Sequence, residues 1–160
     1  MSDSVKRSAF KTFLNTVPAG PAEYEVVGDG ITTAAVNYNP QTLEETYIHE
    51  DSGSTEIESY RPTMPIEATA KAGDAVFEFI DGLRKSRAVL GDAKTDIVNA
   101  WLYETPTAGA YPAEQQNVSI QIDTFGGDGG ASAKINYTIN YLGDPVLGTF
   151  NPSTGTFVAA

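Results

Sequence analysis

The 160-residue chain has no cysteine and only one histidine. The lack of cysteine excludes disulfide frameworks, thiolate metal sites and cysteine nucleophiles. His49 has no second histidine to help it bind a metal, and no serine or cysteine nucleophile signature accompanies it. We therefore expect a surface-loop histidine, no metal and no cofactor.

Basic residues are also scarce. Ten lysines and arginines face 21 aspartates and glutamates, which gives a net charge of −11. Such a field repels nucleic acid, because DNA-binding surfaces need Lys and Arg to replace the phosphate counterions. A protein that grips DNA is disfavoured, whereas a wall that DNA passes without sticking is compatible with this charge. A simple solubilising surface explains the same charge and is, on charge alone, the preferred interpretation.

The sequence has no long hydrophobic run and no visible secretory signal, so we expect no membrane contact and folding in a cytoplasm. Hydrophobic residues make up 41% of the chain and charged residues 19%, as in a globular protein. Fifteen glycines and nine prolines favour a turn-rich β domain. The length suits one domain, which we place at residues 23–160, after an N-terminal arm at residues 1–22.

The predicted arm has one apolar cluster, formed by Phe10, Phe13 and Leu14. The prolines and glycine of residues 18–21 end any helix there. The cluster packs either back on the domain or on a neighbouring chain.

Residues 39–65 are predicted to form a long loop, for which a hairpin with its tip at residues 51–54 is one conformation compatible with the sequence. The segment carries six carboxylates. A compact domain rarely uses some 25 residues for a connection unless the connection has a role, and reaching a partner is the natural one. The residues predicted to make this contact are Glu44, Glu45, Tyr47, Ile48, Asp51, Glu56, Ile57 and Glu58.

One helix is predicted at residues 74–88. Asp74 can cap its first turn, and Val76, Phe77, Ile80 and Leu83 recur at helical spacing. This one-sided apolar stripe indicates a helix that covers a sheet.

The remaining segments alternate as strands do. Residues 24–26 and 33–38, joined through a glycine-flanked Asp29, suggest a hairpin. Residues 97–102 are apolar on both faces, which indicates a central strand, and residues 148–157 suggest a closing hairpin. The clearest alternation, at residues 133–141, indicates a sheet with one buried face and one wet face.

The wet face is predicted to be mostly neutral or acidic. Lys134 is its exception, for which Asp123 is a possible ion-pair partner. The predicted members of this face are Glu23, Glu25, Thr33, Asn37, Ser119, Gln121, Asp123, Lys134, Asn136, Thr138 and Asn140.

No catalytic constellation emerges from the sequence. The glycine-rich run at residues 123–130 lacks the ligands of a calcium loop, and a strand follows it instead of the helix of a phosphate loop. The acidic residues of the long loop lack the fixed separation and cleft of a glycosidase pair. We therefore expect no enzyme.

The order of these parts resembles the major tail tube proteins of long-tailed phages that infect Gram-positive bacteria. The resemblance is strongest at residues 60–65 and 71–89, with further likeness at 39–42 and 148–152. It covers roughly residues 20–157. Ala75 departs from the pattern, which has proline in the first helical turn.

This resemblance implies a mainly β fold, a β-sandwich or barrel flanked by one α-helix, with a long extended loop. It further implies hexameric rings stacked into a tube that lies in the virion tail and is assembled in the host bacterial cytoplasm. The wet face would line the lumen and pass DNA without specific binding, and the long loop would join successive rings. The partners would be the chain itself, a tape-measure protein, and tail tip and terminator proteins.

Two alternatives stay open. One is the inner tube of a contractile or secretion-type machine. The other is a monomeric β-sandwich binding module, for example one that recognises carbohydrate at a cell surface.

Overall fold

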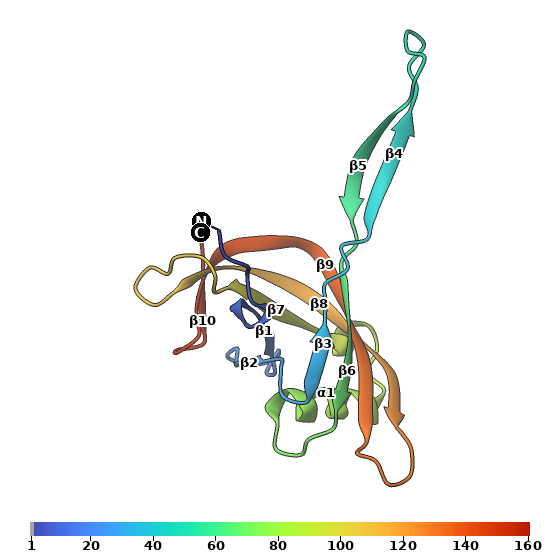
Figure 1. Cartoon of the computed structure of the whole chain (residues 1–160). Helices are drawn as coiled ribbons and strands as arrows, with labels where there is room; N and C mark the ends of the chain where they lie inside the picture. The colour runs from blue at the N-terminus through green and yellow to red at the C-terminus, as the bar shows by residue number, and fades with distance from the viewer. Residues whose placement is uncertain (1) are drawn as a thin grey trace.

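The computed structural model describes residues 2–160 and consists mainly of β-strands with a single α-helix (Figure 1). No helix in these residues is long and apolar enough to cross a membrane. In chain order the elements are η1 (Arg7–Ala9), β1 (Phe10–Asn15), β2 (Tyr24–Val26), β3 (Ile31–Ala34), β4 (Pro40–Glu45), β5 (Ser54–Tyr60), β6 (Thr63–Thr69), α1 (Ala75–Ser86), η2 (Leu90–Ala93), β7 (Lys94–Trp101), β8 (Tyr111–Gly126), β9 (Lys134–Asn151) and β10 (Thr156–Ala159).

One large antiparallel sheet contains most of the strands. Its order is β2-β1-β7-β8-β9-β6-β3, and β10 pairs with β9 beside this path. Strands β4 and β5 form a separate two-stranded sheet that projects from the body (Figure 1). The mainly β fold with one flanking helix is therefore confirmed.

The larger core lies between one face of the sheet and α1. Its fully buried members include Leu14, Ile80, Ile97 and Ile139, which come from β1, α1, β7 and β9. The helix begins where expected, because the Asp74 carboxylate accepts the Phe77 backbone N–H at 3.0 Å. It ends at Ser86, and Arg87 follows in the left-handed conformation with φ 50°.

A smaller core lies on the opposite face of the sheet, where the sheet is strongly curled. The rings of Phe13 on β1 and Phe150 on β9 are 4.6 Å apart. Because β7 and β8 separate β1 from β9, a flat sheet would hold them about 14 Å apart. Curling of the sheet therefore brings these strands together, and Val98, Ala100 and Ala113 complete this second core.

The predicted N-terminal arm is wrong from Phe10 to Asn15. These residues form β1, which pairs with β7 from Phe10↔Trp101 to Leu14↔Ile97 and with β2 on its other side. Leu14 enters the larger core and Phe13 the smaller one. Burial on both faces removes the alternation that identifies a half-buried strand, so the sequence did not reveal β1. Its apolar cluster packs back on the domain.

The predicted hairpin of residues 24–38 is also wrong. β2 pairs with β1, and β3 pairs with β6, so the two strands occupy opposite ends of the sheet order. The glycine turn is present, with Gly30 at φ 81°, but it links two edges of a curled sheet. Because β2 and β3 are close in the sequence, the sequence favours pairing between them. In the structure, the curl of the sheet brings its two edges close enough for a short turn to connect them.

The long loop is a hairpin as far as Tyr60, but its predicted boundary at Pro65 is wrong. β6 begins at Thr63 and pairs with β9 over seven residues, from Thr63↔Asn140 to Thr69↔Lys134. Met64, Ile66 and Ala68 point into the larger core. The strands predicted at residues 97–102 and 133–141 are confirmed as parts of β7 and β9, apart from one residue at an end of each, and the closing hairpin at 148–157 is confirmed as the β9–β10 pair.

Close packing of β9 against β10 makes Gly148 a sensitive position. A Cβ atom there would lie 2.8 Å from the Phe157 ring and 2.9 Å from the Ala159 Cα atom. We expect Gly148→Ala to lower the free energy of unfolding by about 2 kcal/mol. Gly82→Ala, in an exposed part of α1 with no atom within 4 Å, is expected to raise it by about 1 kcal/mol. Urea unfolding of both variants checks this, and equal stabilities would contradict it.

Candidate functional site

Polar side chains form continuous rows across β6, β9 and β8. Cross-strand partners share a face of the sheet, and Asn37↔Thr63, Thr63↔Asn140 and Asn140↔Ser119 are such partners. A second row joins Thr138 to Gln121, a third joins Glu67, Asn136 and Thr124, and a fourth joins Thr69 to Lys134. We define the polar sheet face as Asn37, Thr63, Glu67, Thr69, Lys94, Ser119, Gln121, Asp123, Thr124, Lys134, Asn136, Thr138 and Asn140.

Hydrogen bonds fix the centre of this face. The Asp123 carboxylate accepts from the Gln121 side-chain amide at 2.7 Å and from the Thr138 hydroxyl at 2.9 Å. The Asn140 amide in turn donates to Gln121 at 3.3 Å. The proposed pairing of Lys134 with Asp123 is wrong, because the Lys134 ammonium donates to the Thr69 hydroxyl at 2.8 Å instead. The polar sheet face is therefore ordered by hydrogen bonds between neutral groups and by hydrogen bonds in which one partner is charged.

The charges of the polar sheet face balance. Glu67 and Asp123 are acidic, whereas Lys94 and Lys134 are basic. The sequence prediction missed Lys94 and the whole β6 contribution. The alternation of Met64, Ile66 and Ala68 could have revealed β6, but assignment of residue 65 to the long loop concealed it.

Two predicted members lie elsewhere. Glu25 is the cross-strand partner of Leu14, whose side chain enters the larger core, so Glu25 lies on the opposite face of the sheet. Glu23 directly precedes β2, where its carbonyl accepts the Thr16 backbone N–H. Both therefore lie at the β2 edge, outside the rows that form the polar sheet face. Thr33 is exposed at the irregularity in the β3–β6 register, next to the polar face.

The hairpin is the second candidate surface. Every residue of β5 is exposed, and β4 is exposed except at Gln41. Leu43, Glu44 and Glu45 lie on β4, whereas Glu56, Ile57 and Glu58 lie on β5. Tyr47, Ile48 and Asp51 belong to the turn, where Ile48 is fully exposed at 107%. The predicted contact residues thus share one projecting element, about 20 Å long for six-residue strands.

A groove of about 700 Å³ lies at the base of the hairpin. Tyr38 and Tyr60 meet edge to face across it, with ring centroids 6.3 Å apart. Burial, together with the nearby Glu114 carboxylate, raises the pKa of Tyr38 above its ordinary value. The aromatic pair braces the hairpin against the body.

A polar cluster beside the smaller core joins β1, β2, β7 and β8. The Asp96 carboxylate accepts from the Asn15 amide and the Gln115 amide, both at 2.9 Å, and from the Tyr24 hydroxyl. Burial and the Asp96 carboxylate raise the pKa of Tyr24. Burial also raises the pKa of Tyr141 to about 12. Neither phenol would ionise near neutral pH, so these groups serve as hydrogen-bonding links between strands.

Among residues 2–160, no three histidine, aspartate or glutamate side chains gather in a way that could hold a metal ion. His49 lies in the exposed hairpin turn, 3.8 Å from the Glu50 carboxylate. The polar sheet face and the hairpin are therefore the two candidate functional surfaces. Each offers exposed side chains for contact with another macromolecule.

No protein-family model and no curated protein matches the sequence. Solved structures do match the fold. The tail of an empty GTA particle, determined with C6 symmetry, superposes with a TM-score of 0.64 at 14% identity, over 98% of this chain and 100% of that one.

Two other solved structures also match the fold. The sheath/tube terminator of the extracellular contractile injection system PVC has a TM-score of 0.53 at 12% identity, over 92% of this chain and 98% of that one. The tube-terminating cap of the anti-feeding prophage has a TM-score of 0.51 at 17% identity, over 93% of each chain. The chain therefore has the fold of these tail and tube-associated components.

Proposed function

We propose that this chain is a structural subunit of a tail tube, which self-assembles into stacked hexameric rings whose lumen conducts DNA. The observation that carries the proposal is the match to the GTA tail over nearly the whole of both chains. That assembly has C6 symmetry, and the same symmetry here would produce the hexameric ring. The function is mechanical and needs no catalytic group.

The polar sheet face supports a role as the lumen wall. Its two acidic and two basic residues cancel, and Asp123 is occupied by hydrogen bonds from its own neighbours. Such a wall offers DNA no cluster of Lys and Arg from which counterion release would produce binding. DNA could therefore pass along this surface without being retained by it.

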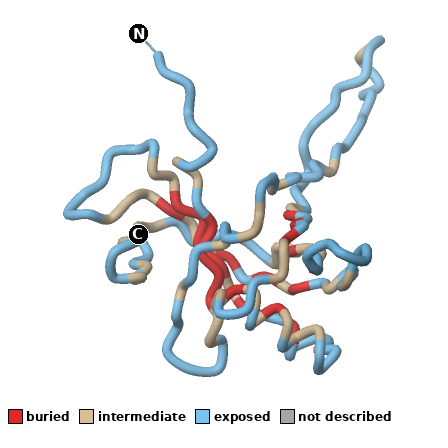
Figure 2. The backbone as a smooth tube through the Cα atoms, turned by 60° about the horizontal axis from the view of Figure 1, so that its bottom comes forward, coloured by how far each residue is buried: buried red, intermediate tan, exposed pale blue. Residues whose placement is uncertain are grey.

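The hairpin supports a role in joining successive rings. It extends away from the body (Figure 2), and an isolated two-stranded hairpin is at best marginally stable in water. Its exposed Ile48 and Ile57 gain burial only when a partner covers them. Tape-measure, tail tip and terminator proteins would be the further partners, in a virion tail assembled in the host bacterial cytoplasm.

A tube component of a contractile injection machine is the second candidate. The matches to the PVC terminator and the anti-feeding prophage cap favour it, at lower TM-scores. A monomeric binding module fits less well, because the exposed Tyr38 and Tyr60 rings at the hairpin base meet edge to face and present no flat platform. Filaments seen by negative-stain electron microscopy would support either tube role, and a chain that stays monomeric at high concentration would refute both.

Removal of the hairpin should separate folding from assembly. Gln41 and Ser59 are cross-strand partners, so an Asn-Gly turn can replace residues 42–58. We expect a folded variant with an unchanged urea midpoint, because neither core uses these residues. Sedimentation should show that it no longer forms filaments. Filaments of wild-type length from this variant would show that another surface joins the rings.

A lysine introduced on the polar sheet face should make the lumen bind DNA. We expect assembled Gln121→Lys tubes to retain a short fluorescent DNA duplex at low salt, because each ring gains six positive charges. Thr154→Lys, in the exposed β9–β10 turn, adds the same charge elsewhere and should retain none. Co-sedimentation measures both. Equal retention by the two variants would count against the lumen assignment.

A further inference from the structure

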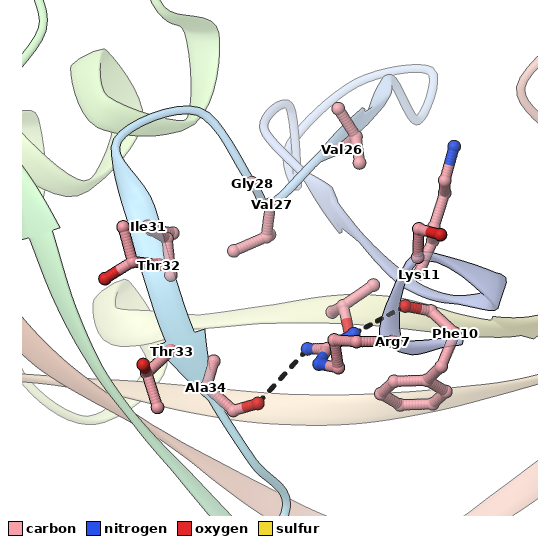
Figure 3. A pocket seen from close by; sticks show the side chains of 12 residues that line it. Arg7, Phe10, Lys11, Val26, Val27, Gly28, Ile31, Thr32, Thr33 and Ala34 are labelled. Atoms are coloured by element: carbon pink, nitrogen blue, oxygen red, sulfur yellow. Dashed lines mark hydrogen bonds between the residues drawn. The ribbon is translucent and has the colours of Figure 1, made fainter. Parts of the chain in front are cut away.

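A groove of about 440 Å³ separates the two edge strands of the curled sheet (Figure 3). β2 and β3 are the two ends of the sheet order, and no backbone hydrogen bond joins these two strands in residues 2–160. Arg7 bridges β1 and β3 at one end of this gap, because its guanidinium donates to the Phe10 carbonyl at 2.6 Å and to the Ala34 carbonyl at 3.2 Å. The curled sheet is thus left open at this seam.

The seam groove, as we call this gap, combines apolar walls with positive charge. Val26, Val27 and Ile31 line it together with Lys11 and Arg7. Neither of these cations, nor the neighbouring Lys6, forms an ion pair within the described chain. In a protein of net charge −11, a groove with unpaired cations favours an acidic occupant.

The hairpin has the complementary composition. From Pro40 to Tyr60 it carries six carboxylates and neither lysine nor arginine. Leu43, Ile48 and Ile57 are exposed among these charges. The groove has apolar and basic side chains, and the hairpin has apolar and acidic ones. Their charges are therefore complementary, and both surfaces have apolar side chains that docking could bury.

The hairpin of one chain cannot reach the seam groove of the same chain. The hairpin projects outward from the body, whereas β2 and β3 lie within the body below the hairpin base (Figure 1). Docking must therefore join two copies. A strand entering the seam would also meet the unpaired outer edges of β2 and β3, which can accept an additional strand.

We propose that the acidic hairpin of one copy docks in the seam groove of a second copy. This inference rests on the proposed self-assembly and names the receptor for the hairpin. The carboxylates of the hairpin would face Lys6, Arg7 and Lys11, and its apolar side chains would cover Val26, Val27 and Ile31.

Cross-linking tests the contact directly, because the chain contains no cysteine of its own. Thr33→Cys places a thiol in the groove, and Ile48→Cys places one at the hairpin tip. Mixed and assembled under oxidising conditions, full-length copies carrying one change each should form a disulfide-linked heterodimer. Thr154→Cys replaces Thr33→Cys in the control mixture, which should form none. Filaments without the Thr33–Ile48 cross-link would overturn the proposal.

Charge reversal tests the chemistry of the contact. We expect Lys11→Glu to raise the critical concentration for assembly by about tenfold. Arg87→Glu makes the same charge change beyond the helix end, outside the groove, and should have little effect. Addition of Glu44→Lys and Glu45→Lys to the Lys11→Glu chain should restore assembly. Equal effects of Lys11→Glu and Arg87→Glu, or no restoration, would contradict the docking.

Different experimental outcomes would refute the tube function and the docking of the hairpin. If the wild-type chain never assembles, both the tube function and the docking are wrong. If filaments form and hairpin removal abolishes them, while the groove variants assemble normally and no cross-link appears, the tube function stands and the docking is wrong. If filaments form without the hairpin, the docking is unnecessary for assembly and is overturned.

Discussion

Strands β8 and β9 stay paired from Tyr111↔Phe150 to Gly126↔Lys134, and the rest of the fold depends on this ladder. The two strands are the longest in the chain, at 16 and 18 residues. One part of the ladder supplies Val118, Ile120 and Ile139 to the larger core, and its far end supplies Ala113 and Phe150 to the smaller one. Register shifts near Asn117 and Thr124 allow these long strands to bend between the cores.

The same ladder also builds the polar sheet face. Because side chains alternate across a strand, burial of Ile135, Tyr137 and Ile139 on one side forces Asn136, Thr138 and Asn140 onto the other. A one-residue slip would exchange the two sets, so the core itself fixes the register of the polar face. The order of the surface is a consequence of the packing beneath it.

The sequence predicted the features that depend on local periodicity. Alternation at residues 133–141 predicted β9 and its two faces, and the stripe of Val76, Ile80 and Leu83 predicted α1. The sequence did not predict the features that depend on contacts between residues far apart in the chain. β1 has no alternation because it is buried on both faces, and the partners of β2 and β3 depend on how the whole sheet curls. The placement of Glu25 failed because alternation shows which residues of β2 share a face, whereas its pairing with Leu14 decides which face of the sheet that is.

The hairpin continues the direction of the sheet strands that carry it, and this arrangement decides how the fold would bear a mechanical load. β3 leads into β4, and β5 leads into β6 after only Arg61 and Pro62 (Figure 1). A pull on the hairpin therefore enters the body along the strand axes. Antiparallel hydrogen bonds lie perpendicular to the strands, so such a pull shears the seven-residue β6–β9 ladder as a unit instead of opening it one bond at a time. A column of these subunits would resist stretching through its existing strand pairing, without any additional covalent link.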